Sequence, residues 1–262
     1  MLEIQGISKT FNPGTVNEKV AIQDLSLTLN DGDFVTVIGG NGAGKSTLLN
    51  LIAGVFPVDC GSIRLNGREL TRLPEYKRAK YLGRVFQDPM TGTAATMNIE
   101  ENLALAARRG QRRTLGWGVT RKEQAEFRTR LSSLELGLED RMTSKVGLLS
   151  GGQRQALTLL MASLQRPELL LLDEHTAALD PKTAAKVLAL SDEVIREGDL
   201  TAMMITHNMR DALAYGNRLI MMDAGHVVLD VSGAEKEKLT VQDLMNAFSQ
   251  ASSFASDRTL LG

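Results

Sequence analysis

Cysteine is almost missing from this sequence, which has Cys60 alone among 262 residues. A single cysteine forms no disulfide and no cysteine-built zinc or iron–sulphur site within one chain, which favours a reducing compartment. Long hydrophobic runs are missing too, since apolar stretches such as 169–172 and 219–222 fall far below the roughly 20 residues that span a hydrocarbon core. The first residues lack a basic segment followed by an apolar one, so no secretion signal is expected. We therefore expect the chain to reach a membrane only through a partner.

An excess of charge of either sign is also absent. Thirty Lys and Arg stand against 31 Asp and Glu, a net charge of -1, so the composition gives no global electrostatic argument for binding nucleic acid. Hydrophobic residues at 43% and charged residues at 23% exclude a disordered or collagen-like chain. The length allows two domains, or one large domain with an insertion. We expect a folded protein without a nucleic-acid partner.

Short strands and helices alternate along most of the chain. Leu25, Leu27 and Leu29 alternate with polar residues, which predicts a strand with one buried face, whereas residues 34–38 are apolar on both sides. Other expected strands are 2–8, 62–65, 169–172, 202–206 and 225–231, and expected helices are 47–53, 154–165, 181–197 and 241–248. This alternation predicts a parallel sheet covered by helices on both faces.

A helix-rich piece at 99–136 interrupts this pattern, with a Gly-rich break at 110–118. The basic run 108–113 beside Trp117 is most simply a solvated loop, and the alternative is contact with anionic lipid headgroups or a membrane subunit. We predict one domain over 1–248 and a C-terminal tail over 249–262. Within that domain, the predicted core comprises 1–95 and 155–232, and the predicted helical subdomain about 96–154.

Residues 39–46 fit the pattern G-x-x-x-x-G-K-[ST] between an expected strand and an expected helix. The segment is Gly39-Gly40-Asn41-Gly42-Ala43-Gly44-Lys45-Ser46. Its glycines let backbone N–H groups point at phosphate oxygens, and the helix N-terminus adds partial positive charge. We expect Lys45 to neutralise the β and γ phosphates, Ser46 to ligate Mg²⁺, and Thr47 to donate to a phosphate oxygen. The pattern predicts a nucleoside triphosphate site; the alternative is a Gly-rich turn with a surface lysine.

Asp173 and Glu174 follow the buried strand 169–172, at the edge where open α/β sheets bind ligands. Buried carboxylates are costly unless a cation meets them. We expect Asp173 to interact with Mg²⁺ and Glu174 to polarise a water for attack on the γ-phosphate, although acids at a strand end are commonly structural. Ser150-Gly151-Gly152-Gln153 precedes a helix and predicts a second anion site, or on the simpler interpretation an N-cap by Ser150. Two such sites make sense if two chains face each other, each covering the other's γ-phosphate.

These motifs, in this order, resemble the ATP-binding subunit of ATP-binding cassette (ABC) transporters of the prokaryotic importer type, over roughly residues 2–230. The resemblance implies an α/β P-loop NTPase (RecA-like) core with a mostly parallel sheet, an N-terminal antiparallel β part and an inserted α-helical subdomain. In that family residues 39–46 form the Walker A motif, residues 169–174 the Walker B motif and residues 150–153 the signature motif.

The resemblance assigns four further positions. Gln87 resembles the Q-loop glutamine, which touches Mg²⁺ and responds to the membrane subunits, and His207 resembles the switch histidine, which contacts the γ-phosphate. Asp180 resembles the D-loop aspartate, which links two subunits, and Phe11 occupies the place of the ring under adenine. Considered alone, these are a polar residue after a strand, a structural histidine, a helix N-cap and a core phenylalanine. His175 follows Glu174 where the family usually has proline, and the sequence assigns it no role.

The resemblance implies an ATPase that powers transport through separate integral membrane permease subunits, on the cytoplasmic face of the cell membrane. It implies a homodimer, MgATP as the bound species and, indirectly, a solute-binding protein. Residues 11–15 and 174–176 resemble cassette ATPases associated with amino-acid uptake, so import of an amino acid or similar small solute is expected. The alternatives are an exporter or lipid-extraction ATPase, and a soluble ABC ATPase of the iron–sulphur cluster assembly type.

Overall fold

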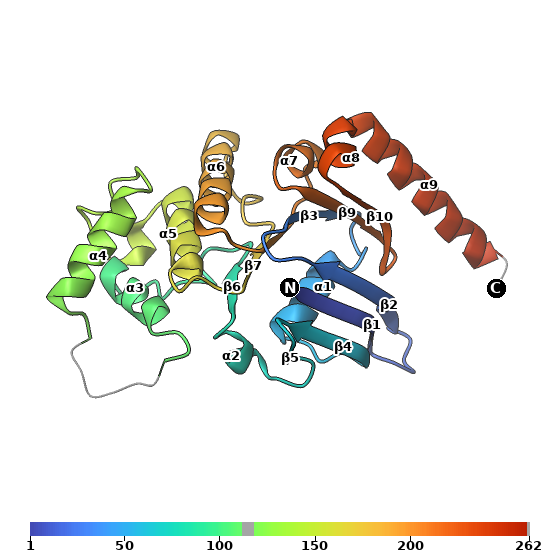
Figure 1. Ribbon diagram of the computed structural model, residues 1–262, viewed down its shortest axis with the longest axis horizontal. Coiled ribbons are helices and arrows are strands. Elements are labelled where there is room, and N and C mark those ends of the chain that lie inside the picture. The colour runs from blue at the N-terminus through green and yellow to red at the C-terminus, as the bar shows by residue number, and fades with distance from the viewer. Residues whose placement is uncertain (112–117, 261–262) are drawn as a thin grey trace. The chain divides into compact units, whose positions relative to one another are not determined.

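The computed structural model describes residues 1–111 and 118–260, and the chain divides into two compact units. The first unit comprises Met1–Arg78 and Thr201–Gly262, and the second comprises Ala79–Leu200. Figure 1 labels the helices and strands of both.

An antiparallel sheet in the first unit contains the N-terminal strands, in the order β2-β1-β4-β5. Their bounds are β1 Leu2–Phe11, β2 Lys19–Leu29, β4 Cys60–Leu65 and β5 Arg68–Glu69. Leu2 lies opposite both Leu29 and Leu65, and Leu25, Leu27 and Leu29 are all buried, so the predicted alternation is confirmed. The antiparallel β part implied by the sequence is therefore present.

Four strands of a second, mostly parallel sheet also belong to the first unit, in the order β10-β9-β3-β8. They are β3 Phe34–Gly39, β8 Ala202–Ile205, β9 Arg218–Asp223 and β10 His226–Ser232. Strand β3 pairs in parallel with β8 and β9, and only β10 runs antiparallel. All but the last residue of β3 are buried, as expected for a strand covered on both faces. Strand β9 is not among the strands expected from the sequence, because the apolar run 219–222 carries no period that identifies a strand.

The described residues of the first unit also form five helices: α1 Lys45–Ala53, α2 Glu75–Arg78, α7 Met209–Ala214, α8 Gly233–Lys238 and α9 Val241–Leu260. Helix α9 is expected from the sequence to end at Phe248, yet it continues to Leu260 (Figure 1). No glycine or proline interrupts residues 249–261, so the sequence holds no strong stop signal there. Leu244 of α9 is fully buried in a cluster with Ile38 and Met221.

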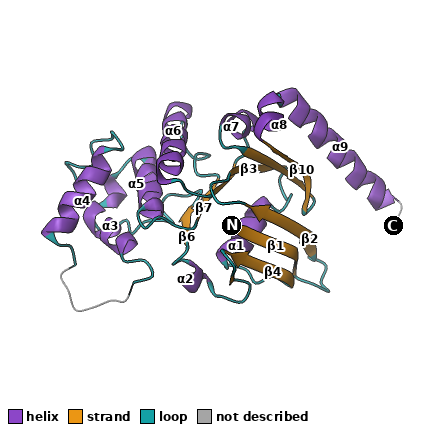
Figure 2. Cartoon of the chain, in the orientation of Figure 1, coloured by secondary structure: helices purple, strands orange, loops and turns teal. Residues whose placement is uncertain are grey.

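Helices predominate in the second unit (Figure 2). Strands β6 Leu82–Val85 and β7 Leu169–Asp173 pair in parallel. The helices are α3 Ile99–Ala107, α4 Arg121–Ser132, α5 Gly151–Ser163 and α6 Pro181–Gly198, with a 3₁₀ turn at Val146–Leu148. Buried residues of α3, α4 and α5, among them Leu103, Phe127 and Leu157, share one core. The boundaries of the predicted helical subdomain, about 96–154, fall inside this unit and remain a prediction.

The first residues of the basic run differ from the expected solvated loop. The Arg108 guanidinium forms a 2.8 Å ion pair with Glu123, and Arg109 donates to the carbonyl of Ala162 at 3.0 Å. Both arginines are only partly exposed, because their guanidinium groups bind other residues of the second unit. Arg112, Arg113 and Trp117 lie outside the described residues.

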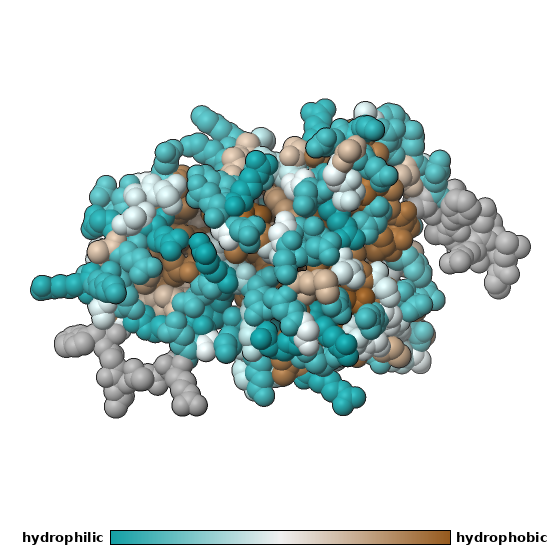
Figure 3. Space-filling view, viewed as in Figure 1, coloured by the Kyte–Doolittle hydropathy of each residue, from teal (hydrophilic) through white to brown (hydrophobic). Residues whose placement is uncertain are grey.

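None of the described helices combines the length and the apolar content that crossing a membrane requires. On the face drawn in Figure 3, hydrophilic side chains predominate, with smaller hydrophobic groups between them.

Candidate functional site

The glycine-rich loop connects β3 to α1 in the first unit, as the motif requires. Gly44 is the N-cap of α1 and has a φ of 99°, and a Cβ at this position would lie 2.6 Å from the carbonyl oxygen of Ala21. Gly39 has a φ of 153°, and a Cβ there would overlap the carbonyl oxygen of Met222. Both positions therefore need glycine, for backbone conformation and for space.

Lys45 folds back over this loop. Its ammonium donates to the carbonyl oxygens of Gly39 at 2.8 Å and Gly40 at 3.0 Å, and the residue is 6% exposed. No side chain caps the first turn of α1, which also contains no acidic residue. A fixed cation beside uncapped helical N–H groups favours an anionic ligand.

Neighbouring loop residues present polar groups to solvent. Asn41, Gly42 and Ser46 are exposed, whereas Ala43 is buried and Thr47 is partly buried. Ser46 is thus exposed at the start of α1, as its predicted role requires.

His207 follows β8 and is exposed. Val37 of β3 pairs with Ile205 of β8, so the glycine-rich loop and His207 both leave the carboxyl ends of adjacent parallel strands. The sheet therefore brings His207 to the loop's edge, where ligands of open α/β sheets bind.

Phe11 ends β1 and is partly exposed. Its ring meets Phe56 edge-on at 5.2 Å between centroids, and Lys9 Nζ lies 5.7 Å from the Phe11 centroid. The ring is held by these neighbours, and its predicted stacking role remains untested.

In the second unit, Asp173 is the last residue of β7 and makes an ion pair with Arg84 of β6. Arg84 Nη2 lies 3.3 Å from Asp173 Oδ2, and each side chain is 14% exposed. The guanidinium carbon also lies 4.5 Å from the Phe86 ring centroid.

Gln87 lies two residues beyond β6 and is exposed. The carbonyl of Phe86, the residue before it, accepts a hydrogen bond from the Gln155 side chain at 3.1 Å. The parallel pairing of β6 and β7 therefore places Gln87 and Asp173 at the same end of the two strands.

Ser150 is the N-cap of α5. Its hydroxyl accepts from Gln153 N at 3.3 Å, and Gln153 Oε1 accepts from Ser150 N at 3.2 Å, so the two form a capping box. This confirms the N-cap interpretation and leaves Ser150 and Gly151 exposed. A Cβ on Gly152 would overlap Thr183, so glycine permits α5 and α6 to approach closely.

Between β7 and α6 the chain makes a tight connection. Glu174 is partly buried and has a φ of 45°, a backbone conformation that residues other than glycine rarely adopt. Asp180 is the N-cap of α6 and accepts from Thr183 N at 3.1 Å, with Pro181 at the first turn. His175, which the sequence left without a role, is 2% exposed, and this burial lowers its pKa to about 4.

The donor chemistry of the candidate residues fits Mg²⁺. A serine hydroxyl and a carboxylate are hard oxygen donors, and Mg²⁺ in phosphate sites typically takes one or two such protein ligands beside substrate phosphates and water. Within residues 1–111 and 118–260, no three His, Cys, Asp or Glu side chains form a metal cage.

Comparisons with known proteins agree with this chemistry. The family model described as ABC transporter matches residues 22–177. The chain is 46% identical over 251 residues to a tyrosine transport ATP-binding protein of Clostridioides difficile, an alignment covering 96% of this chain and 100% of the relative. It is 35% identical over 232 residues to a methionine import ATP-binding protein of Corynebacterium efficiens, covering 87% of this chain and 61% of that relative.

A solved structure shows the same fold. It is the dimeric structure of a post-hydrolysis state of an ATP-binding cassette bound to ADP and Pi, with a TM-score of 0.76 and 26% sequence identity, covering 88% of this chain and 98% of that one. The predicted fold class is confirmed by this match and by the two sheets. The chain therefore belongs to the ABC transporter family, as one of its ATP-binding, ATP-hydrolysing cassettes.

Proposed function

We propose that this chain is the ATPase subunit of an importer for an amino acid, with tyrosine as the first candidate solute. The supporting observation is the 46% identity to a tyrosine transport ATP-binding protein along that relative's full length. The similarity to a methionine import ATP-binding protein supports import of a small solute more broadly. The solute would pass through separate permease subunits, with a solute-binding protein as an indirect partner, at the cytoplasmic face of the membrane.

The residues of the candidate site divide by role. Residues 39–47 bind the phosphates of ATP, with the Lys45 ammonium neutralising their charge, and Phe11 stacks on adenine. Glu174 accepts a proton from the attacking water, and His207 contacts the γ-phosphate. Ser46, Gln87 and Asp173 hold Mg²⁺, which when bound would neutralise charge on the phosphate oxygens. The exposure of Ser46 and the ion pair of Asp173 with Arg84 support these assignments.

A second copy of the chain completes each site in this proposal. Ser150, Gly151, Gly152 and Gln153 would cover the nucleotide of the partner, and Asp180 would link the two copies. The exposed helix N-terminus at Ser150 and the dimeric state of the solved cassette bound to ADP and Pi support this arrangement. Nucleic acid has no part in it.

The test begins with tagged chain recovered from detergent-solubilised membranes. We expect permease subunits to copurify, and the assembly rebuilt in vesicles with its binding protein to take up labelled tyrosine when ATP is present. Assemblies carrying Glu174→Gln should bind ATP without uptake, which controls for passive leakage. Recovery with a soluble iron–sulphur assembly complex, or ATP-driven movement of lipid or solute out of the cell, would contradict the importer assignment.

A further inference from the structure

His175 and Ser191 form a buried pair in the second unit. His175 Nε2 lies 2.9 Å from Ser191 Oγ, and the two residues are 2% and 1% exposed. Ser191 belongs to α6, and its hydroxyl also donates to the carbonyl of Val187 at 2.8 Å. The pair thus joins the segment that follows β7 to the middle of a long helix.

The direction of the hydrogen bond follows from counting protons. A serine hydroxyl has one proton, and here that proton goes to the carbonyl of Val187. With that proton on the Val187 carbonyl, Ser191 Oγ accepts from His175, so the arrangement that satisfies both contacts has the imidazole proton on Nε2. The contact is a directed hydrogen bond, which a side chain that merely fills the same space would not reproduce.

The residue before His175 has a strained backbone. Glu174 has a φ of 45°, in the left-handed region, and such a conformation persists only where its surroundings impose it. One constraint is a turn, in which Ala177 N donates to the carbonyl of Glu174 at 2.9 Å. Another is the buried side chain of His175, whose hydrogen bond to Ser191 joins the residue after Glu174 to α6.

We propose that His175 and Ser191 are positioning residues for Glu174, because their hydrogen bond anchors the backbone that carries this carboxylate. The inference rests on the proposed role of Glu174 in hydrolysis. A carboxylate that activates water works only when it is held close to one geometry, so loosening the anchor lowers turnover. Binding of nucleotide depends on residues 39–47 and should be spared.

The first test measures basal ATP hydrolysis and nucleotide affinity of the full-length chain. We expect Ser191→Ala and His175→Leu each to lower kcat about tenfold, while the Kd of a fluorescent ATP analogue stays within twofold. The double variant should be no slower than the slower single variant, because both changes remove one interaction. His175→Gln, whose amide can still donate to Ser191, should recover most of the lost turnover.

Ser163→Ala is the matched control. The Ser163 hydroxyl donates to the carbonyl of Leu159 at 3.0 Å, within α5, so it resembles Ser191 in type and in its bond to the preceding turn. It has no histidine partner among the contacts of the described residues. We expect its kcat to stay within twofold of the parent value.

The second test observes the imidazole directly. The chain has three histidines, so nitrogen-labelled histidine gives a spectrum simple enough to assign with His175→Leu. We expect the His175 signal to show the Nε2-protonated neutral ring with a slowly exchanging proton, and Ser191→Ala to speed that exchange.

Three results would overturn the inference without refuting the proposed role of Glu174. The first is an Nδ1-protonated ring at His175, and the second is additive losses of kcat accompanied by loss of nucleotide affinity and thermal stability, which indicate a merely structural role. The third is parent-like kcat in Ser191→Ala while Glu174→Gln is inactive, which refutes the anchor and leaves the role of Glu174 intact. Hydrolysis by Glu174→Gln at the parent rate would instead refute the proposed role of Glu174, and the inference with it.

Discussion

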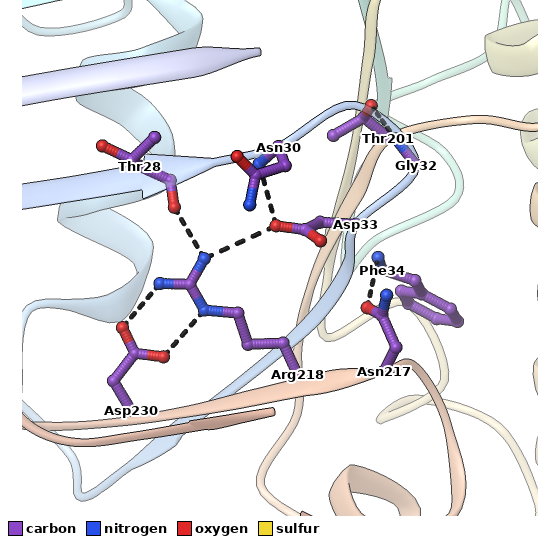
Figure 4. A network of polar contacts seen from close by, with 9 residues as sticks. All are labelled: Thr28, Asn30, Gly32, Asp33, Phe34, Thr201, Asn217, Arg218 and Asp230. Atoms are coloured by element: carbon purple, nitrogen blue, oxygen red, sulfur yellow. Dashed lines mark hydrogen bonds and ion pairs between the residues drawn. The ribbon is translucent and has the colours of Figure 1, made fainter. Parts of the chain in front are cut away.

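Replacing Arg218 with methionine should destabilise the first unit substantially. Arg218 opens β9 and makes two hydrogen bonds to the Asp230 carboxylate, at 2.7 and 2.6 Å (Figure 4). Its Nη1 donates to the carbonyl of Thr28 at 2.6 Å and lies 3.5 Å from Asp33. Hydrogen bonding to Asp230 raises the pKa of Arg218, against an opposing effect of desolvation. The guanidinium thus joins β2, β9 and β10.

The size of the expected loss in the free energy of unfolding follows from the burial of the ion pair. The side chains of Arg218 and Asp33 are each 16% exposed, whereas Asp230 is 35% exposed and can recover water. Removing one member of a buried pair costs about 3–5 kcal/mol, and partial exposure reduces this to about 2–4 kcal/mol. Methionine keeps the aliphatic stem, so the loss comes mainly from the guanidinium.

The assay is urea unfolding followed by circular dichroism. With a slope of about 3 kcal/mol per M of urea, a loss of 3 kcal/mol lowers the midpoint by about 1 M. Arg64→Met is the control, because the Arg64–Glu69 pair lies in the same unit with both side chains about half exposed, and it should cost under about 1 kcal/mol. Equal midpoint shifts for the two variants would refute the reasoning.

Other expected outcomes concern the candidate site. Glu174→Gln should bind ATP normally, hydrolyse it at least about 100-fold more slowly and accumulate as a dimer in light scattering; a persistent monomer at saturating ATP would contradict the two-copy site. Lys45→Ala should weaken binding of a fluorescent ATP analogue at least about tenfold, through loss of a charge facing the phosphates, and an unchanged Kd would contradict that role. Gly39→Ala should lower the thermal midpoint more than Gly67→Ala, because a Cβ at Gly67 meets nothing within 4 Å while one at Gly39 overlaps a backbone carbonyl; equal shifts would argue against the overlap.

The strand, loop and helix around Lys45 could be predicted from sequence within one or two residues. Three independent signals agree there: a doubly buried strand, a glycine spacing and a helix start. The N-caps at Ser150 and Asp180 were likewise readable, because capping depends on residues three apart in sequence. Local chemistry of this kind needs no knowledge of the fold.

The residues that contact the candidate catalytic side chains could not be predicted from local sequence. Arg84 and Asp173 are 89 positions apart and meet because β6 and β7 pair in parallel in a particular register. His175 and Ser191 meet because the connection after β7 turns back along α6. Sequence periodicity carries no information on strand register or on the path of a connection. The sequence therefore shows that His175 stands where the family usually has proline, but it does not show that Ser191 is the partner of His175.

The groups that bind Lys45 and Asp173 affect how the candidate site works, because they orient these two charged side chains. Lys45 donates to two loop carbonyls, and Arg84 Nη2 lies 3.3 Å from Asp173 Oδ2. A charge that is already partly desolvated and oriented needs little rearrangement when phosphate binds. The expected tenfold loss for Lys45→Ala is therefore a lower bound, since the variant loses the orientation of the loop carbonyls together with the charge.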